Sequence, residues 1–145
     1  MTNVKRLIYA AVAAASLLSA FESPAAGGER LAMPDFTKGD KIPEQAKKDW
    51  NLGPTGLRGW MFCDRLVTTD ARQIAVTAVD DGSPADGVIA VGDVLLGAGG
   101  KPFSFDPRTE LGRAITAAET EAGGGKLALT RWRAGKSEEV VVSLP

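Results

Sequence analysis

Short runs of apolar residues along the chain show the period-two alternation that predicts β-strands. One such run, residues 73–79, follows an apolar run at residues 60–67 that also predicts a strand, and a polar turn at residues 68–72 joins the two. Two more, residues 126–133 and 137–144, flank a glycine-containing turn and predict a closing hairpin. The pattern therefore favours a largely antiparallel sheet.

One segment, residues 105–121, has helical spacing instead. Asp106 is a good N-cap, and Pro107 fits the first helical position, where its missing N–H costs nothing. The three glycines at 123–125 end the segment. The stripe expected to face the core consists of Leu111, Ala114, Ile115, Ala118 and Ala122.

The stretch between these strands and the long helix, residues 82–103, combines several turn signals. Ser83 can cap a short helix that Pro84 begins and that Gly87 ends in a left-handed conformation. After it, the sequence predicts a short extended piece, a turn, a buried strand and a two-residue hairpin turn, at residues 88–89, 92–93, 94–96 and 99–100.

Residues 1–26 have the features of a secretory signal peptide. Lys5 and Arg6 precede an apolar run at residues 7–20, which is shorter than the ~20 residues that span a bilayer. An uncleaved membrane anchor is the alternative. We expect cleavage, export to the periplasm or the exterior, and no stable membrane insertion afterwards.

A polar lead-in or linker, residues 27–53, separates this segment from the folded domain, residues 54–145. Glycines and prolines break it up, although residues 44–50 could form a short helix. Trp50 and Leu52 would anchor its end to the domain. A partner-contacting arm is the alternative interpretation.

Composition removes several classes of function. The chain has no histidine, a single cysteine (Cys63) and a net charge of −1. Catalysis by Ser-His-Asp or Cys-His groups and histidine-containing metal sites are excluded. The charge gives no general attraction to nucleic acid. We expect no enzyme activity, no cofactor and no metal, and we interpret Cys63 as a small buried apolar residue.

Residues 82–103, GSPADGVIAVGDVLLGAGGKPF, resemble a PDZ domain of the bacterial, circularly permuted type that accompanies peptidases. The SPA-x-x-G run, the following GD-hydrophobic run and the closing hairpin carry the resemblance, which covers residues 54–145. It implies an α+β fold: a small, partly open antiparallel β-barrel or sandwich of five to six strands, with one short and one long helix.

A second resemblance involves the lead-in and the first strand, DFTKGDKIP…DWNLGPTGLRGWMF. This stretch is similar to the start of a poorly characterised family of secreted bacterial proteins in which a PDZ domain precedes a larger C-terminal domain. The chain would then be the N-terminal part of a longer protein.

The PDZ resemblance implies a peptide groove between the first strand and the long helix. Glycines at 56 and 59 permit a nest of backbone N–H groups that suits a carboxylate. In PDZ domains a glycine–hydrophobic–glycine–hydrophobic loop has this role. Gly59-Trp60 matches its second half, whereas the residues before it match the first half only with one insertion. The candidate peptide-binding residues are Gly56, Leu57, Arg58, Gly59, Trp60, Met61 and Phe62, with Arg108, Gly112 and Thr116 on the helix.

The sequence thus predicts an exported module that captures a protein or peptide by strand addition, through its C-terminus or an extended segment. A structural docking domain with a non-functional groove is one alternative. An accessory or regulatory fragment of a larger secreted, protease-like enzyme is the other. For the first hypothesis, Gly59→Val is expected to abolish capture and to leave the fold largely intact.

Overall fold

The computed structural model describes residues 31–46 and 48–145. The predicted signal peptide and the first residues of the lead-in lie outside the described residues. Within the described ranges no helix is both long enough and apolar enough to cross a bilayer.

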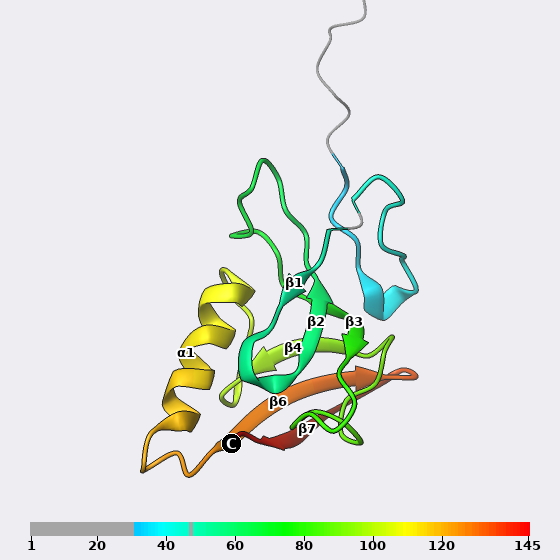
Figure 1. Ribbon diagram of the computed structural model, residues 1–145. Coiled ribbons are helices and arrows are strands. Elements are labelled where there is room, and N and C mark those ends of the chain that lie inside the picture. Colours follow the sequence, from blue (N-terminus) through cyan, green and yellow to red (C-terminus); the bar gives the residue numbers. More distant parts are fainter. Residues whose placement is uncertain (1–30, 47) are drawn as a thin grey trace, which may run out of the picture.

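A seven-stranded antiparallel sheet and one α-helix make up the described part of the chain (Figure 1). The sheet order is β1-β2-β3-β4-β6-β7, and β5 pairs with β4 off this path. This is a small α+β domain, as the sequence predicted, with more strands than the five to six expected. The strands are β1 (Trp50–Asn51), β2 (Leu57–Trp60), β3 (Ile74–Val79), β4 (Val94–Ala98), β5 (Lys101–Pro102), β6 (Lys126–Arg133) and β7 (Lys136–Ser143).

The long helix, α1 (Pro107–Glu119), is confirmed together with its cap. The Asp106 carboxylate accepts a hydrogen bond from the Arg108 amide at 3.0 Å, and Pro107 occupies the first turn. The side chains of Leu111, Ile115 and Ala118, on one face of the helix, are buried. Ala122 lies beyond the end of the helix and is exposed. The helix therefore ends about two residues before the predicted point.

The strand predicted at residues 60–67 is wrong. The chain leaves the sheet after Trp60, and Asp64 and Val67 form an isolated bridge around a tight turn. Arg65 and Leu66 adopt left-handed conformations there, with φ of 51° and 69°, which reverse the chain within two residues. Trp60 and Met61 still face opposite cores, as strand residues do, but the reversal at Arg65 and Leu66 takes the chain out of the sheet.

The predicted short helix at Ser83 is also wrong, because residues 82–89 form successive turns and bends, and the extended piece predicted at residues 88–89 is not a strand. The Asp86 carboxylate, and not Ser83, holds the turn by accepting a hydrogen bond from the Gly82 amide at 2.9 Å. The Ser83 hydroxyl has no hydrogen-bond partner. Gly87 is left-handed as predicted, with φ of 77°.

The hairpins at the end of the domain follow the sequence closely. Gly99 and Gly100 both have positive φ and connect β4 to β5. The closing pair, β6 and β7, is in continuous register from Lys126↔Ser143 to Arg133↔Lys136.

The sheet carries a core on each face. Alternation along β3 places Ile74 in the main core, which α1 covers, and Ala75 in the second core. The second core contains Phe36 and Trp60, whose rings meet edge to face at 5.7 Å. Phe36 lies in a single 3₁₀ turn, η1 (Phe36–Lys38), of the lead-in. Figure 1 shows this arm, in cyan, on the opposite side of the sheet from α1.

The helix predicted at residues 44–50 is absent. A turn replaces it, in which the Ala46 amide donates to the Pro43 carbonyl at 3.0 Å. The Ala46 carbonyl accepts a hydrogen bond from the Trp60 indole instead of a helical amide. Trp50 then joins the sheet as part of β1.

Candidate functional site

The outer edge of β2 is covered by the chain itself. β1 pairs antiparallel with it, in the register Trp50↔Gly59 and Asn51↔Arg58. The connecting loop is short and contains a second 3₁₀ turn, η2 (Gly53–Thr55). At the β2 edge, where the sequence predicted that a ligand strand would add, the sheet already has a strand.

The amides of this loop are used internally. The Gly53 amide donates to Asn51 Oδ1 at 2.8 Å, and the Leu57 amide donates to Thr55 Oγ1 at 3.1 Å. The Gly56 amide points to the Gly53 carbonyl at 3.4 Å. The loop's own oxygens therefore hold the N–H groups of the predicted carboxylate nest.

Gly56 has a structural reason to be glycine. Its φ is 76°, and a Cβ atom there would lie 2.1 Å from the Ser83 Cβ. A side chain at position 56 would collide with the turn that follows β3. The glycine therefore serves the contact between two loops.

Several of the predicted peptide-binding residues are core residues. Leu57 and Met61 are fully buried in the main core, and Trp60 is buried in the second core. Phe62 is half-buried and packs against both cores. These side chains mainly stabilise the domain, and none of them lines the groove between β1 and α1.

Gly59 faces the core closely. A Cβ atom there would lie 2.4 Å from Ile74 Cγ2 and 3.1 Å from Leu52 Cδ1. The expectation that Gly59→Val leaves the fold intact is therefore wrong, because the valine side chain has no space.

Arg58 is paired within the domain. Its guanidinium donates to Asp49 Oδ1 from two nitrogens, at 3.0 and 2.6 Å. Thr77 donates to the other carboxylate oxygen at 2.8 Å. The hydrogen bonds from Arg58 and Thr77 lower the pKa of Asp49 below its ordinary value. This network fastens the start of β1 to β2 and β3.

On the helix side, two of the three predicted residues reach a groove. The Arg108 guanidinium lies 4.6 Å from the centre of the Trp50 ring, within cation–π range. Gly112 lies further along the same side of α1, and a Cβ atom there would meet nothing within 4 Å. Thr116 donates its hydroxyl to the Gly112 carbonyl at 3.0 Å and is not among the groove's lining residues.

We call this feature the β1–α1 groove. It has a volume of about 300 Å³ and is mostly apolar, and Arg108 is the one charged residue in its lining within residues 31–46 and 48–145. Its lining residues are Trp50, Asn51, Leu52, Gly53, Pro54, Arg108, Leu111, Gly112 and Ile115. Sequence reasoning treated Trp50 and Leu52 as anchors of a linker and so missed their place here. Their alternation directly before a glycine-rich turn was the available signal of a strand.

The backbone of β1 offers hydrogen-bonding groups to this groove. The Leu52 amide donates to the Leu57 carbonyl at 2.9 Å. Since bonded and non-bonded pairs alternate in an antiparallel ladder, the backbone N–H and C=O of Asn51 point away from β2. β1 is also an edge strand of the sheet, with no further strand of the described residues paired on its outer side. An extended segment can therefore pair with Asn51 on its outer side.

A second hollow adjoins the β1–α1 groove at Trp50, which lines both. It has a volume of about 250 Å³ and is mainly apolar. Of the residues that the structure describes, its lining includes one charged residue, Lys48, and the half-buried Cys63. We call it the Trp50–Leu66 hollow. Its other lining residues are Ala46, Trp60, Met61 and Leu66.

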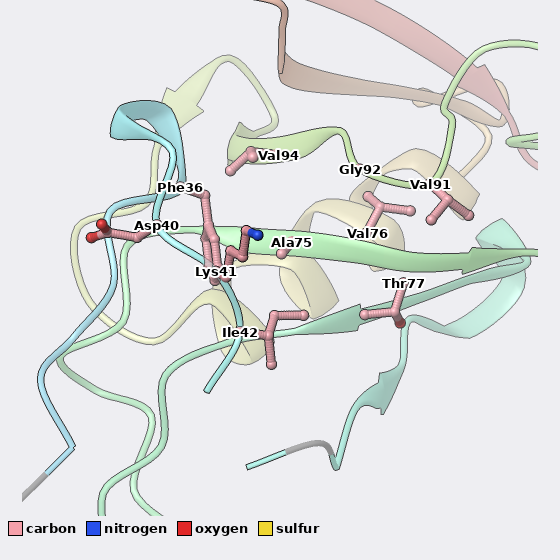
Figure 2. Close-up of a pocket in the computed structure, with 10 residues that line it drawn as sticks. All are labelled: Phe36, Asp40, Lys41, Ile42, Ala75, Val76, Thr77, Val91, Gly92 and Val94. Carbon is pink, nitrogen blue, oxygen red and sulfur yellow. The ribbon is translucent and has the colours of Figure 1, made fainter. Parts of the chain in front are cut away.

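A third hollow, of about 430 Å³, lies on the other face of the sheet, where Figure 2 shows Ile42 of the arm and Val91 on either side of β3. β3 is paired here with both β2 and β4, so no strand edge is free. This hollow therefore offers no unpaired backbone groups of a strand edge to a ligand strand, unlike the β1–α1 groove.

No metal centre is evident in the described ranges, where no three cysteine or acidic side chains cluster as ligands would. No protein-family model matches the chain, and no curated protein sequence matches it with significance. The geometry of the groove is therefore the basis for assigning a function.

Proposed function

We propose that the chain is a PDZ-like binding module that captures an extended segment of another protein in the β1–α1 groove. One observation carries the proposal. The edge strand β1 faces the long helix α1 across an apolar groove, and the backbone N–H and C=O of Asn51 point away from β2, toward that groove. Strand addition uses such an edge for main-chain hydrogen bonds and the neighbouring hollows for side chains.

The proposed site lies one strand further out than the PDZ resemblance implies. In the site that the resemblance implies, the ligand lies beside the first strand of the folded domain, which corresponds to β2. In this structure β1 already occupies that edge of β2. Each main-chain hydrogen bond contributes about 0.5–1.5 kcal/mol net, and ordering a free segment offsets part of it. With an edge strand of two residues, affinity should be modest.

A second candidate function is supported by the way β1 is held. Leu52 is 5% exposed and belongs to the main core, and the loop amides bond to the loop itself. β1 then resembles a ligand that the chain supplies to its own groove. The domain would be a structural docking unit, and its partner surface would lie elsewhere.

Gly112 offers a direct test. Gly112→Leu adds an apolar side chain into the groove without a clash, because its Cβ position is open. Ala117→Leu makes a comparable change on an exposed position of α1 that lines a different hollow. Segments selected from a displayed random library against the full chain would be synthesised with a fluorophore, and binding followed by fluorescence polarisation.

We expect the selected peptides to bind the parent and Ala117→Leu proteins, and to lose binding to Gly112→Leu. Circular dichroism would establish that both variants are folded. A library that yields no binder to the folded chain would contradict the proposal and favour the docking unit. Peptides that bind Gly112→Leu as tightly as they bind the parent protein would show that the binding site is not the β1–α1 groove.

A further inference from the structure

We infer that the captured segment is an internal stretch of a protein, with apolar side chains and one acidic side chain, and not a free C-terminus. This inference rests on the proposed function, because it concerns the ligand of the β1–α1 groove. It follows from where the donors and charges of the groove lie.

The first step concerns the terminal carboxylate. A C-terminus needs a cluster of free N–H groups at the end of the groove. The loop amides at Gly53 and Leu57 instead donate to Asn51 Oδ1 and Thr55 Oγ1. Binding a carboxylate there would break two hydrogen bonds that the folded loop already makes.

The second step concerns charge. Among the described residues, Arg108 is the one charged residue lining the β1–α1 groove, and Lys48 is the one charged residue lining the adjoining Trp50–Leu66 hollow. Both are cationic, although the whole chain has a net charge of −1. The nearby Asp49 carboxylate is paired with Arg58. Asp106 is buried, and its Oδ2 lies 3.5 Å from Arg108 Nη2, so neither carboxylate presents an unpaired negative charge to a ligand.

Arg108 can reach a ligand. Its side chain is 40% exposed, and the Trp50 ring supports one face of its guanidinium. One of its nitrogens, Nη2, lies 3.5 Å from the buried Asp106 carboxylate, and within the described residues the guanidinium donates no side-chain hydrogen bond. Its remaining N–H groups can therefore donate to a ligand carboxylate. An acidic side chain of the ligand, at the level of Trp50, therefore has a matching partner.

The third step concerns spacing. The groove and the Trp50–Leu66 hollow share Trp50 and are both mainly apolar. An extended chain points every second side chain to the same side. Two hollows that adjoin at Trp50 thus suit apolar side chains on the same side of one segment, and a segment that spans both continues past Trp50 without ending there.

The test compares two displays of one random library, within a host loop and at a host C-terminus, against the full chain. Selected segments would be synthesised with both ends blocked or with a free carboxylate. We expect the loop display to yield binders rich in apolar and acidic residues, and blocking the C-terminus to leave their affinity unchanged.

Charge reversal gives a second readout. Arg108→Glu should weaken binding of an acidic segment by about tenfold or more, and replacing the ligand's acid with lysine should restore it. Arg113→Glu is the matched control, because Arg113 is on the same helix but lines another hollow. Arg108→Gln separates loss of charge from repulsion.

The outcomes are distinct. Binders that require a free C-terminus, or that bind Arg108→Glu as well as the parent, would overturn this inference and leave the proposed groove in place. Failure of both displays to yield any binder to the folded chain would overturn the proposed function itself.

Discussion

The Thr68 hydroxyl donates a hydrogen bond to Asp106 Oδ1 at 2.8 Å, and both side chains are buried although 38 residues separate them. Asp106 is also the N-cap of α1. This one hydrogen bond therefore fixes the start of the helix, and with it Arg108, to the irregular segment that follows β2. The position of one wall of the groove depends on it.

Thr68→Val should lower the free energy of unfolding by about 1–2 kcal/mol, because it removes a hydrogen bond to a buried carboxylate and keeps the side-chain shape. Urea denaturation measures the change. Thr116→Val is the control, since the Thr116 hydroxyl is exposed and bonds only to its own helix. In a cycle with Asp106→Asn, strictly additive effects would contradict a direct coupling between the two residues.

A second buried carboxylate contributes to the dependence of stability on pH. Asp93 is 4% exposed at its side chain and accepts two hydrogen bonds from Arg133, at 2.7 and 2.6 Å. Burial alone would raise the pKa of Asp93, but the hydrogen bonds from Arg133 and the Ala90 amide, with the charges of Arg133 and Arg131, bring it below the ordinary value of 3.8.

Because the pKa of Asp93 is lower in the folded chain than in the unfolded chain, its ionised form contributes stability above pH 3.8. That contribution is lost as the pH falls through the folded value. Asp93→Asn should therefore be less stable than the parent by about 2 kcal/mol at neutral pH, and should lose less stability on acidification to about pH 3.

Thermal unfolding across that pH range would show the difference. The same substitution at the exposed Asp81 controls for the loss of one negative charge. Parallel pH profiles for the parent and Asp93→Asn proteins would mean that this ion pair does not set the acid sensitivity.

Sequence alone predicted well those elements whose start or turn is determined by residues of the element itself. Asp106 and Pro107 mark the start of α1 by local hydrogen bonding and a fixed φ, whatever surrounds them. Gly99 and Gly100 adopt positive φ at the turn that their identity favours. The strands β6 and β7 are neighbours in sequence and pair with each other, so the signal for their hairpin is local.

The groove was harder to predict because its parts come from distant segments. Nothing in the local pattern shows that Trp50 would pair opposite Gly59, or that Arg108 would stack on Trp50. Two residues, Arg65 and Leu66, take left-handed conformations that a sequence pattern does not anticipate for non-glycine residues. The glycines at 56 and 59 were interpreted as a binding loop, whereas both are required by close packing.

Gly59→Ala tests that packing directly. The added Cβ would approach Ile74 Cγ2, and the neighbouring strand would have to move to accommodate it. We expect a loss of about 1–3 kcal/mol in the free energy of unfolding, the usual cost of overpacking a core. Gly112→Ala, whose Cβ position is open and helical, should instead gain up to about 1 kcal/mol.

Chemical denaturation of the two variants under one set of conditions is the measurement. The comparison controls for the general effect of replacing glycine by alanine. Equal stability of Gly59→Ala and the parent would show that β2 and β3 are more loosely packed than their distances indicate.

The lead-in arm provides the last prediction. Phe36 packs edge to face on Trp60, and its amide donates to Gln73 Oε1 at 2.8 Å. Phe36→Ala removes most of the apolar contact that holds η1 on the sheet. Trypsin should then cleave after the exposed Lys38 or Lys41 at least about tenfold faster, the factor expected when docking is weakened by about 1.4 kcal/mol.

The readout is limited proteolysis followed by mass spectrometry of the fragments. Leu31→Ala, which changes an exposed apolar residue of the same arm, should leave the cleavage rate unchanged. The domain should survive arm release, because α1 and the main core do not include Phe36. A Phe36→Ala protein that is cleaved no faster than the parent would mean that the contacts of Gln73 with Asp35 and Phe36 are sufficient to hold the arm.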